Sequence, residues 1–247
     1  MKFDYNRAAA FTGHRPQKLP FGFDESLPEA KKLRAFIAQE IEYAALCGYI
    51  YFLTGMALGT DMIAAEEVLR LKQELYPQIS LIAVIPCGGQ SDKWSDESKK
   101  RYDNIISRAS HVIRLSERPY FNGCMQARNR FLVEHSTLLI GVYDGTAGGT
   151  RSTIDMAEKR GNAVAIIDPS RFVRIVPVDN DRQLEYYHKT ENRCERQLRY
   201  LRENKPELLE LWAEYSDEYT TPAQRYAASG RLCCLCCEGQ FETDFTL

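Results

Sequence analysis

The sequence lacks any apolar run that approaches the roughly 20 residues needed to cross a bilayer. Its first segment, Met1 to Arg7, also lacks the apolar core of a secretory signal peptide. We therefore expect a cytoplasmic protein without a membrane anchor. In that reducing compartment its eight cysteines are expected to remain thiols.

An excess of charge of either sign is also missing, because 32 basic and 34 acidic residues leave a net charge of −2. No field over the whole molecule therefore favours nucleic acid or a membrane as partner. Hydrophobic residues make up 44% and charged residues 27%, which excludes a disordered chain, a collagen and a coiled-coil rod. Acidic residues prevail only from Asp179 onward, so we expect a domain boundary near Pro177.

Two common phosphate-binding fingerprints are absent, G-x-G-x-x-G and G-x-x-x-x-G-K-[ST]. Their absence argues against an ordinary dinucleotide oxidoreductase and against a P-loop enzyme. A convincing metal motif is absent too. Four cysteines within five residues are too cramped to close a tetrahedron around zinc, so a flexible tail is the favoured interpretation and a soft-metal or redox role is the weaker one. These weak candidate ligands are Cys233, Cys234, Cys236 and Cys237.

What the sequence does contain is a regular alternation of two kinds of segment. Short, nearly continuous apolar runs are typical of strands buried on both faces of a parallel sheet. They span residues 8–12, 50–54, 79–85, 111–115, 137–143 and 163–167. The stretches between them carry apolar residues at helical spacing, and a capping box at Ser26 to Glu29 begins the first of them. This order predicts a doubly wound, mostly parallel α/β sheet with helices on both faces.

Unusual residues follow the predicted strands, where such sheets bind ligands. The segments are Thr12 to Pro16, Thr54 to Asp61, Pro86 to Trp94, Met125 to Arg128, and Asp144 to Thr153. Glycine lets the backbone approach a ligand, a helix start suits phosphate, and arginine binds oxyanions. The predicted ligand-binding residues are Gly13, His14, Arg15, Gly55, Gly59, Thr60, Asp61, Gly88, Gly89, Trp94, Arg128, Asp144, Gly148, Gly149, Thr150 and Thr153.

Simpler interpretations stand beside these. Thr60 and Thr150 are also suited to be N-caps, and Trp94 is a common kind of packing residue. Arg101 and Arg130 are expected to be solvated charges on helix faces. The ligand site is therefore predicted from the coincidence of several such segments at one sheet edge, and no single glycine carries it.

The same segments, from about Ala8 to Ile167, resemble the SLOG superfamily of Smf/DprA and LOG proteins, and within it the YpsA-like branch. The resemblance implies a Rossmann-like fold with a nucleotide-type ligand at the carboxyl edge of the sheet. We thus expect a nucleotide-binding domain over residues 1–178, and a mainly helical extension with a Cys-rich tail over residues 179–247. No other cofactor is expected. A protein partner for the extension and a homo-oligomer both remain open.

The resemblance leaves three functions to weigh. LOG enzymes hydrolyse the N-glycosidic bond of nucleoside monophosphates, and Met125 to Arg128 resembles one of their signature elements. Thr153 stands where the other element has its catalytic Glu, so the remaining catalytic candidates are Arg128, Asp155 and Asp144. Smf/DprA proteins bind single-stranded DNA, for which the slight basic excess gives thin support. We favour a nucleotide-binding sensor or regulator over an enzyme, and consider nucleic acid unlikely.

Overall fold

The computed structural model describes residues 3–177 and 180–190. The chain divides into two compact units, Met1–Tyr187 and His188–Leu247. The fold described here is that of the first unit. The Cys233 to Cys237 cluster and most of the predicted helical extension lie outside the described residues, and the boundary near Pro177 stays a prediction.

One seven-stranded sheet forms the centre of this unit, in the order β4-β3-β2-β1-β5-β6-β7. Six strands are parallel, and only β7 runs antiparallel, against β6. The order reverses at β1, which pairs with β2 on one side and with β5 on the other. The strands are β1 (Ala8–Gly13), β2 (Tyr51–Thr54), β3 (Ser80–Ile85), β4 (His111–Arg114), β5 (Leu138–Val142), β6 (Ala163–Asp168) and β7 (Val173–Ile175).

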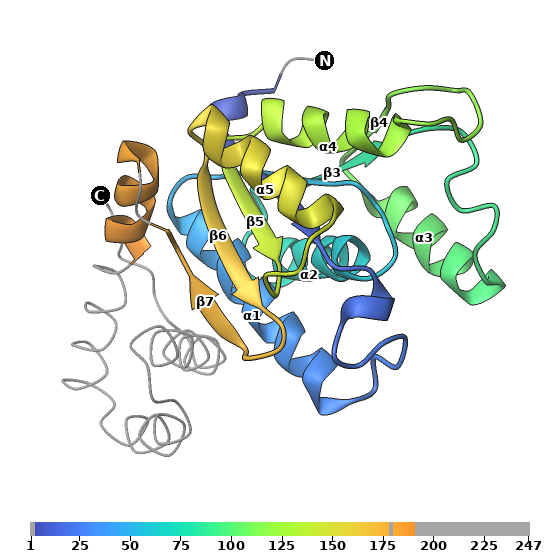
Figure 1. Cartoon of the computed structure of the whole chain (residues 1–247), viewed down its shortest axis with the longest axis horizontal. Coiled ribbons are helices and arrows are strands. Elements are labelled where there is room, and N and C mark those ends of the chain that lie inside the picture. The colour runs from blue at the N-terminus through green and yellow to red at the C-terminus, as the bar shows by residue number, and fades with distance from the viewer. Residues whose placement is uncertain (1–2, 178–179, 191–247) are drawn as a thin grey trace. The chain divides into compact units, whose positions relative to one another are not determined.

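Among the described residues, five α-helices between β1 and β6 cover the two faces of the sheet. Helices α1 and α2 pack together behind the sheet in Figure 1, and α3 contacts α2. Helices α4 and α5 pack together on the front, with α5 over β5 and β6. The right-handed crossover rule gives this division, because the chain moves one way across the sheet up to β4 and the other way after it. The helices are α1 (Pro28–Leu46), α2 (Thr60–Glu74), α3 (Asp96–Arg108), α4 (Cys124–Glu134) and α5 (Gly149–Arg160).

The core explains why apolar runs became strands. Ala8, Ala9 and Ala10 of the central strand β1 are fully buried, and their small side chains let helices approach from both faces. Larger residues fill the neighbouring strands, among them Leu53, Ile82 and Leu139. Such packing removes both faces of the sheet from water, which is the main stabilising effect available to a domain of this size.

The predicted α/β fold is confirmed, and all six predicted strands are present within one or two residues. The short strand β7 was missed, because three residues give too little periodicity. The predicted capping box is wrong. Leu27 is the N-cap of α1, and the Ser26 hydroxyl donates instead to the Asp24 carboxylate at 2.6 Å. Within the described residues, no helix combines the length and the apolar character that crossing a bilayer requires.

Candidate functional site

A cavity of about 420 Å³ lies where the strand order reverses, beyond the carboxyl ends of β1 and β5. We call it the switch-point cavity. Four parts of the chain line it, namely the end of β1 with the turn after it, the start of α2, one side of α4, and the loop between β5 and α5. Open α/β sheets place ligands at this point, because two adjacent loops diverge there to opposite faces.

The end of β1 is held close to α2, and glycine makes this possible. A Cβ on Gly13 would lie 2.5 Å from the Thr60 side chain, so any larger residue would push the strand from the helix. The Thr60 hydroxyl and backbone N–H both donate to the carbonyl oxygen of His14, at 3.1 and 3.2 Å. Gly59, with φ of +89°, is the N-cap of α2. A Cβ added to Gly59 would lie 2.7 Å from the same carbonyl oxygen. These contacts fix the backbone that presents His14 and Arg15.

His14 is buried, and its Nε2 atom lies 2.8 Å from Oδ1 of Asp144 in the loop after β5. The Asp144 carboxylate also accepts the backbone N–H and the hydroxyl of Thr146, at 2.9 and 2.8 Å. Burial acts to raise the pKa of Asp144, but these hydrogen bonds and His14 lower it to about 2. Asp144 therefore stays ionised and anchors the β5–α5 loop to the end of β1.

Arg128 on α4 reaches across the cavity to Asp61 at the start of α2. Its Nη1 atom lies 3.1 Å from Asp61 Oδ2, and both side chains are 7% exposed. Asp61 Oδ2 also accepts the backbone N–H of Ala57 at 3.2 Å. Burial, together with the charge of Arg15, lowers the pKa of the Arg128 guanidinium, and Asp61 opposes that shift. Among the residues that the structure describes, Asp61 is the one carboxylate that lines the cavity, and it is engaged by this ion pair.

Gly55, after β2, leaves the space that the Arg128 side chain occupies. A Cβ on Gly55 would lie 1.5 Å from Arg128 Nη1, so no other residue fits beside this guanidinium. Gln90, from the loop after β3, donates its amide to the carbonyl oxygens of Gly55 and Met56, at 3.2 and 2.7 Å. Gly55 and Gln90 thus lie behind Arg128 and do not themselves line the cavity, whereas Ala57 of the same β2–α2 loop does.

Two further cations line the cavity. The Arg15 side chain is exposed and forms no ion pair or hydrogen bond among the described residues. Lys18, in the 3-10 turn Pro16–Lys18, donates to the Thr146 hydroxyl and the Ala147 carbonyl, both at 3.2 Å. No carboxylate neutralises either side chain within the part of the chain that the structure describes. Sequence reasoning missed Lys18, although its position three residues after Arg15 was a usable signal.

The N-terminus of α5 completes the anion-attracting wall. Gly148, Gly149 and Thr150 line the cavity, and no side chain of the described residues caps the first N–H groups of this 12-residue helix. Uncapped N–H groups and the positive end of the helix dipole favour an anion. Gly148 is the N-cap here and Gly59 is the N-cap of α2, so the alternative interpretation of Thr60 and Thr150 as N-caps is wrong.

Thr153, which stands in the place of a catalytic Glu, is fully buried and engaged. Its hydroxyl donates to the Gly149 carbonyl at 2.8 Å and accepts the Asn129 amide at 2.9 Å. Asp155 forms an ion pair with Arg151 on the surface of α5, 2.7 Å apart, and does not line the cavity. Asp144 does not line it either. Of the two carboxylates nominated as catalytic, Asp144 and Asp155, neither therefore lines the cavity.

The structure thus brings together half of the residues that the sequence nominated. The cavity is lined by Gly13, His14, Arg15, Asp61, Arg128, Gly148, Gly149 and Thr150. The other nominated residues lie behind its wall or away from it. These are Gly55, Gly59, Thr60, Gly88, Gly89, Trp94, Asp144 and Thr153.

The loop after β3, which was predicted to contribute Gly88, Gly89 and Trp94 to the ligand site, does not line the cavity. Gly88 faces the carbonyl oxygen of Glu117, and Gly89 adopts a φ of +68° beside Asp92. The Trp94 ring stands edge-on against Tyr102, with centroids 5.5 Å apart, so its interpretation as a packing residue fits the structure. These residues shape a turn over α3 and leave the cavity to the other four segments.

Arg101 is not the solvated helix-face charge that we expected. It pairs with Glu25 and Glu66, both at 2.6 Å, while Arg34 pairs with the same two carboxylates at 2.7 Å. Although burial acts to raise the pKa of Glu66, Arg101 and Arg34 lower it below its ordinary value. This network joins α1, α2 and α3, which a linear sequence does not reveal. Arg130, by contrast, is exposed as expected.

Comparison with known proteins supports the sequence resemblance. Residues 9–169 match the YspA SLOG family. A UPF0398 protein of Bacillus velezensis is 30% identical over 163 residues, which cover 62% of this chain and 85% of that protein. A UPF0398 protein of Bacillus pumilus is 28% identical over 142 residues, or 57% of this chain and 75% of that one.

Two solved structures of DNA processing protein A are also similar. The Helicobacter pylori protein, whose structure concerns its single-stranded DNA binding mode, matches with a TM-score of 0.46 and 22% identity over 74% of this chain and 72% of that chain. The Streptococcus pneumoniae protein matches with a TM-score of 0.45 and 20% identity over 75% and 56%.

Proposed function

The chain belongs to the YspA SLOG family, and we propose that it binds a nucleotide, or a phosphorylated ligand derived from one, in the switch-point cavity as a sensor or regulator. The observation that carries this proposal is the convergence of Arg15, Lys18 and the uncapped start of α5 on one cavity, in which the described residues place no free carboxylate. Each favours a phosphate group, and together they give it several donors.

The remainder of the cavity suits the less charged part of such a ligand. Phe11, Met125 and Leu132 contribute apolar side chains, and Asn129 contributes an amide. A volume of about 420 Å³ is within the range of small-molecule sites. A mixed wall of this kind favours a phosphorylated nucleoside over inorganic phosphate alone.

Binding is better supported than hydrolysis. Cleavage of an N-glycosidic bond needs a carboxylate to stabilise positive charge on the sugar or to activate water. Asp61 is held by Arg128 and by the Ala57 N–H, while Thr153 donates its hydroxyl hydrogen to the helix backbone. Single-stranded DNA remains an outcome to test, because its binding needs an extended basic groove with aromatic platforms.

The proposal is tested by calorimetric titration of the protein with AMP, UMP, ADP and UDP-glucose. We expect one binding site per chain for at least one of them, and about tenfold weaker affinity in Arg15→Ala and in Lys18→Ala, because each variant removes a charged donor. Arg130→Ala removes an exposed cation of α4 outside the cavity and should bind as the wild type does. A cytoplasmic location for this activity is part of the proposal.

Three results would count against this function. The first is no binding of any of the four compounds. The second is equal affinity in all three variants. The third is release of free base from AMP or UMP at a rate that Arg128→Ala abolishes, which would favour the N-glycosidase. Tight, salt-sensitive binding of a single-stranded oligonucleotide without nucleotide binding would favour the DNA-binding alternative.

A further inference from the structure

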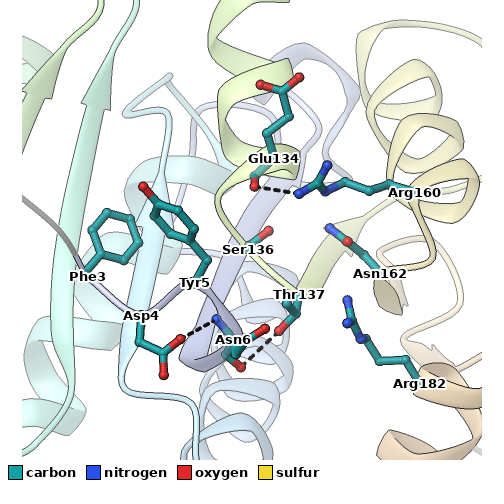
Figure 2. A pocket seen from close by; sticks show the side chains of 10 residues that line it. All are labelled: Phe3, Asp4, Tyr5, Asn6, Glu134, Ser136, Thr137, Arg160, Asn162 and Arg182. Atoms are coloured by element: carbon teal, nitrogen blue, oxygen red, sulfur yellow. Dashed lines mark hydrogen bonds between the residues drawn. The ribbon is translucent and has the colours of Figure 1, made fainter.

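A second cavity, of about 540 Å³, lies at the opposite, amino end of the parallel strands (Figure 2). The residues just before three strands form it, namely Asn6 before β1, Ser136 and Thr137 before β5, and Asn162 before β6. We call it the amino-edge cavity. It shares no lining residue with the switch-point cavity, so an inference about it is independent of the proposed function.

Asn162 carries the one polar atom of this cavity wall that is buried without a partner among the described residues. The side chain is 1% exposed, and its Nδ2 atom donates to the Val133 carbonyl oxygen at 3.0 Å. This bond sets the orientation of the amide, since a flipped amide would bring two oxygens together. Oδ1 is left as a buried acceptor with no donor. Such an atom costs free energy until a ligand or water donates to it.

The neighbouring hydroxyls present acceptors as well. Ser136 donates its hydroxyl hydrogen to the Leu132 carbonyl at 2.8 Å, and Thr137 donates to the Asn6 carbonyl at 3.1 Å. The Thr137 oxygen also lies 3.5 Å from the Tyr49 hydroxyl. Because a hydroxyl has a single hydrogen, the Ser136 and Thr137 oxygens offer lone pairs, and not a donor, to the cavity. Three acceptors, including Asn162 Oδ1, therefore lie on one wall, and a ligand with several hydroxyl groups would match them.

Two guanidinium groups, those of Arg160 and Arg182, add positively charged hydrogen-bond donors to this cavity. Arg160 donates to the carbonyl oxygen of Glu134 at 3.0 Å, and Figure 2 shows the Glu134 carboxylate turned away from it. The Arg182 side chain forms no hydrogen bond or ion pair within the described residues. The Asp4 carboxylate accepts the Asn6 N–H at 3.0 Å. Neither arginine is paired with a carboxylate in the described part of the chain, so an oxyanion is the complementary group.

We propose that the amino-edge cavity is a second binding site, and that it takes a small sugar phosphate. The phosphate lies against Arg160 and Arg182, and the sugar hydroxyls donate to Asn162 Oδ1 and to the hydroxyl oxygens of Ser136 and Thr137. The volume is within the range of small-molecule sites. Because the cations and the acceptors lie apart in the cavity, a ligand that carries both a phosphate and sugar hydroxyls should bind better than phosphate or the sugar alone.

The test is calorimetric titration of the full chain with three probes, ribose 5-phosphate, ribose and inorganic phosphate. We expect saturable binding of ribose 5-phosphate, and affinities at least tenfold weaker for ribose and for phosphate. Arg182→Gln and Arg160→Gln should each weaken ribose 5-phosphate binding about tenfold, because each removes a charged donor. Asn162→Ala should weaken ribose 5-phosphate binding and leave phosphate binding unchanged.

Two comparisons separate this site from the first one and from nonspecific charge. Arg130→Gln, outside both cavities, should bind ribose 5-phosphate as the wild type does. Arg15→Ala, in the switch-point cavity, should retain the binding that Arg160→Gln and Arg182→Gln weaken. The proposal is overturned if the wild type binds none of the probes, if Arg182→Gln and Arg160→Gln bind normally, or if Arg15→Ala abolishes binding. Should Asn162→Ala fail to fold, the two exposed arginines decide the question alone.

Discussion

Nη1 of Arg128 lies 3.1 Å from Oδ2 of Asp61 inside the switch-point cavity, with 7% of each side chain exposed. The two residues are 67 positions apart in the sequence, on α4 and α2. Their pairing ties together the two faces of the sheet at the point where the strand order reverses. It also keeps one arginine charge balanced while Arg15 and Lys18 remain available to a ligand.

Asp61→Asn should destabilise the protein by about 3–5 kcal/mol, because it leaves the Arg128 charge buried without its partner. Urea denaturation measures this change in the free energy of unfolding. The matched control is Asp155→Asn, which removes a partner from the surface pair with Arg151 and should cost at most about 1 kcal/mol. Equal effects of the two variants would show that the Arg128–Asp61 pair is not desolvated.

Gly55→Ala should displace Arg128, since the added methyl group would lie 1.5 Å from its Nη1 atom. We expect a lower melting temperature together with weaker nucleotide binding, measured by thermal shift with and without ligand. Gly149→Ala is the control, because a Cβ there meets nothing within 4 Å. That variant should keep or slightly raise the melting temperature, as alanine is the better helix former by about 1 kcal/mol. A Gly55→Ala protein with unchanged stability and binding would contradict the packing described.

Asp144 should make the free energy of unfolding depend on pH in the acid range. Its pKa in the folded state is about 2, below the value of about 3.9 expected in the unfolded chain. The ionised carboxylate therefore stabilises the fold above about pH 4, and this contribution is lost as the pH falls toward 2. The difference in unfolding free energy between the wild type and Asp144→Asn should shrink over that interval. A difference that stays constant from pH 6 to pH 2 would be inconsistent with this role.

Arg101→Met should destabilise the protein by more than an exposed ion pair would, about 1–3 kcal/mol, because it leaves Glu66 and Glu25 with Arg34 alone. The salt dependence of unfolding should weaken at the same time, since a multi-charge contact is lost. Arg130→Met, on an exposed face of α4, is the control and should have little effect. Indistinguishable unfolding curves for the two variants would show that the Arg101 ion pairs add no more stability than a solvated surface charge does.

Local patterns in the sequence were enough to predict the architecture. The apolar runs that became β1 to β6 are unbroken because both faces of those strands are buried, and the intervening periodicity defines the helices. From the parallel order it follows that residues after the strands gather at one edge, which is how Arg15, Arg128 and Gly149 were found. The strand β7 and the ion-pair network of Arg101 were not predicted, because β7 is only three residues long and the network joins three helices.

The amino-acid sequence by itself determined the alternating elements and the family, and it indicated the carboxyl edge as the place of a candidate site, because these depend on periodicity and on short segments. Only the tertiary structure decided which nominated residues line the cavity, that Asp61 is engaged by Arg128, and that Asn162 and Arg160 meet Arg182 around a second cavity. The physical reason is that hydrogen bonds and ion pairs form between atoms a few ångströms apart. Those distances are set by packing among strands and helices remote in the chain, and no local pattern encodes them.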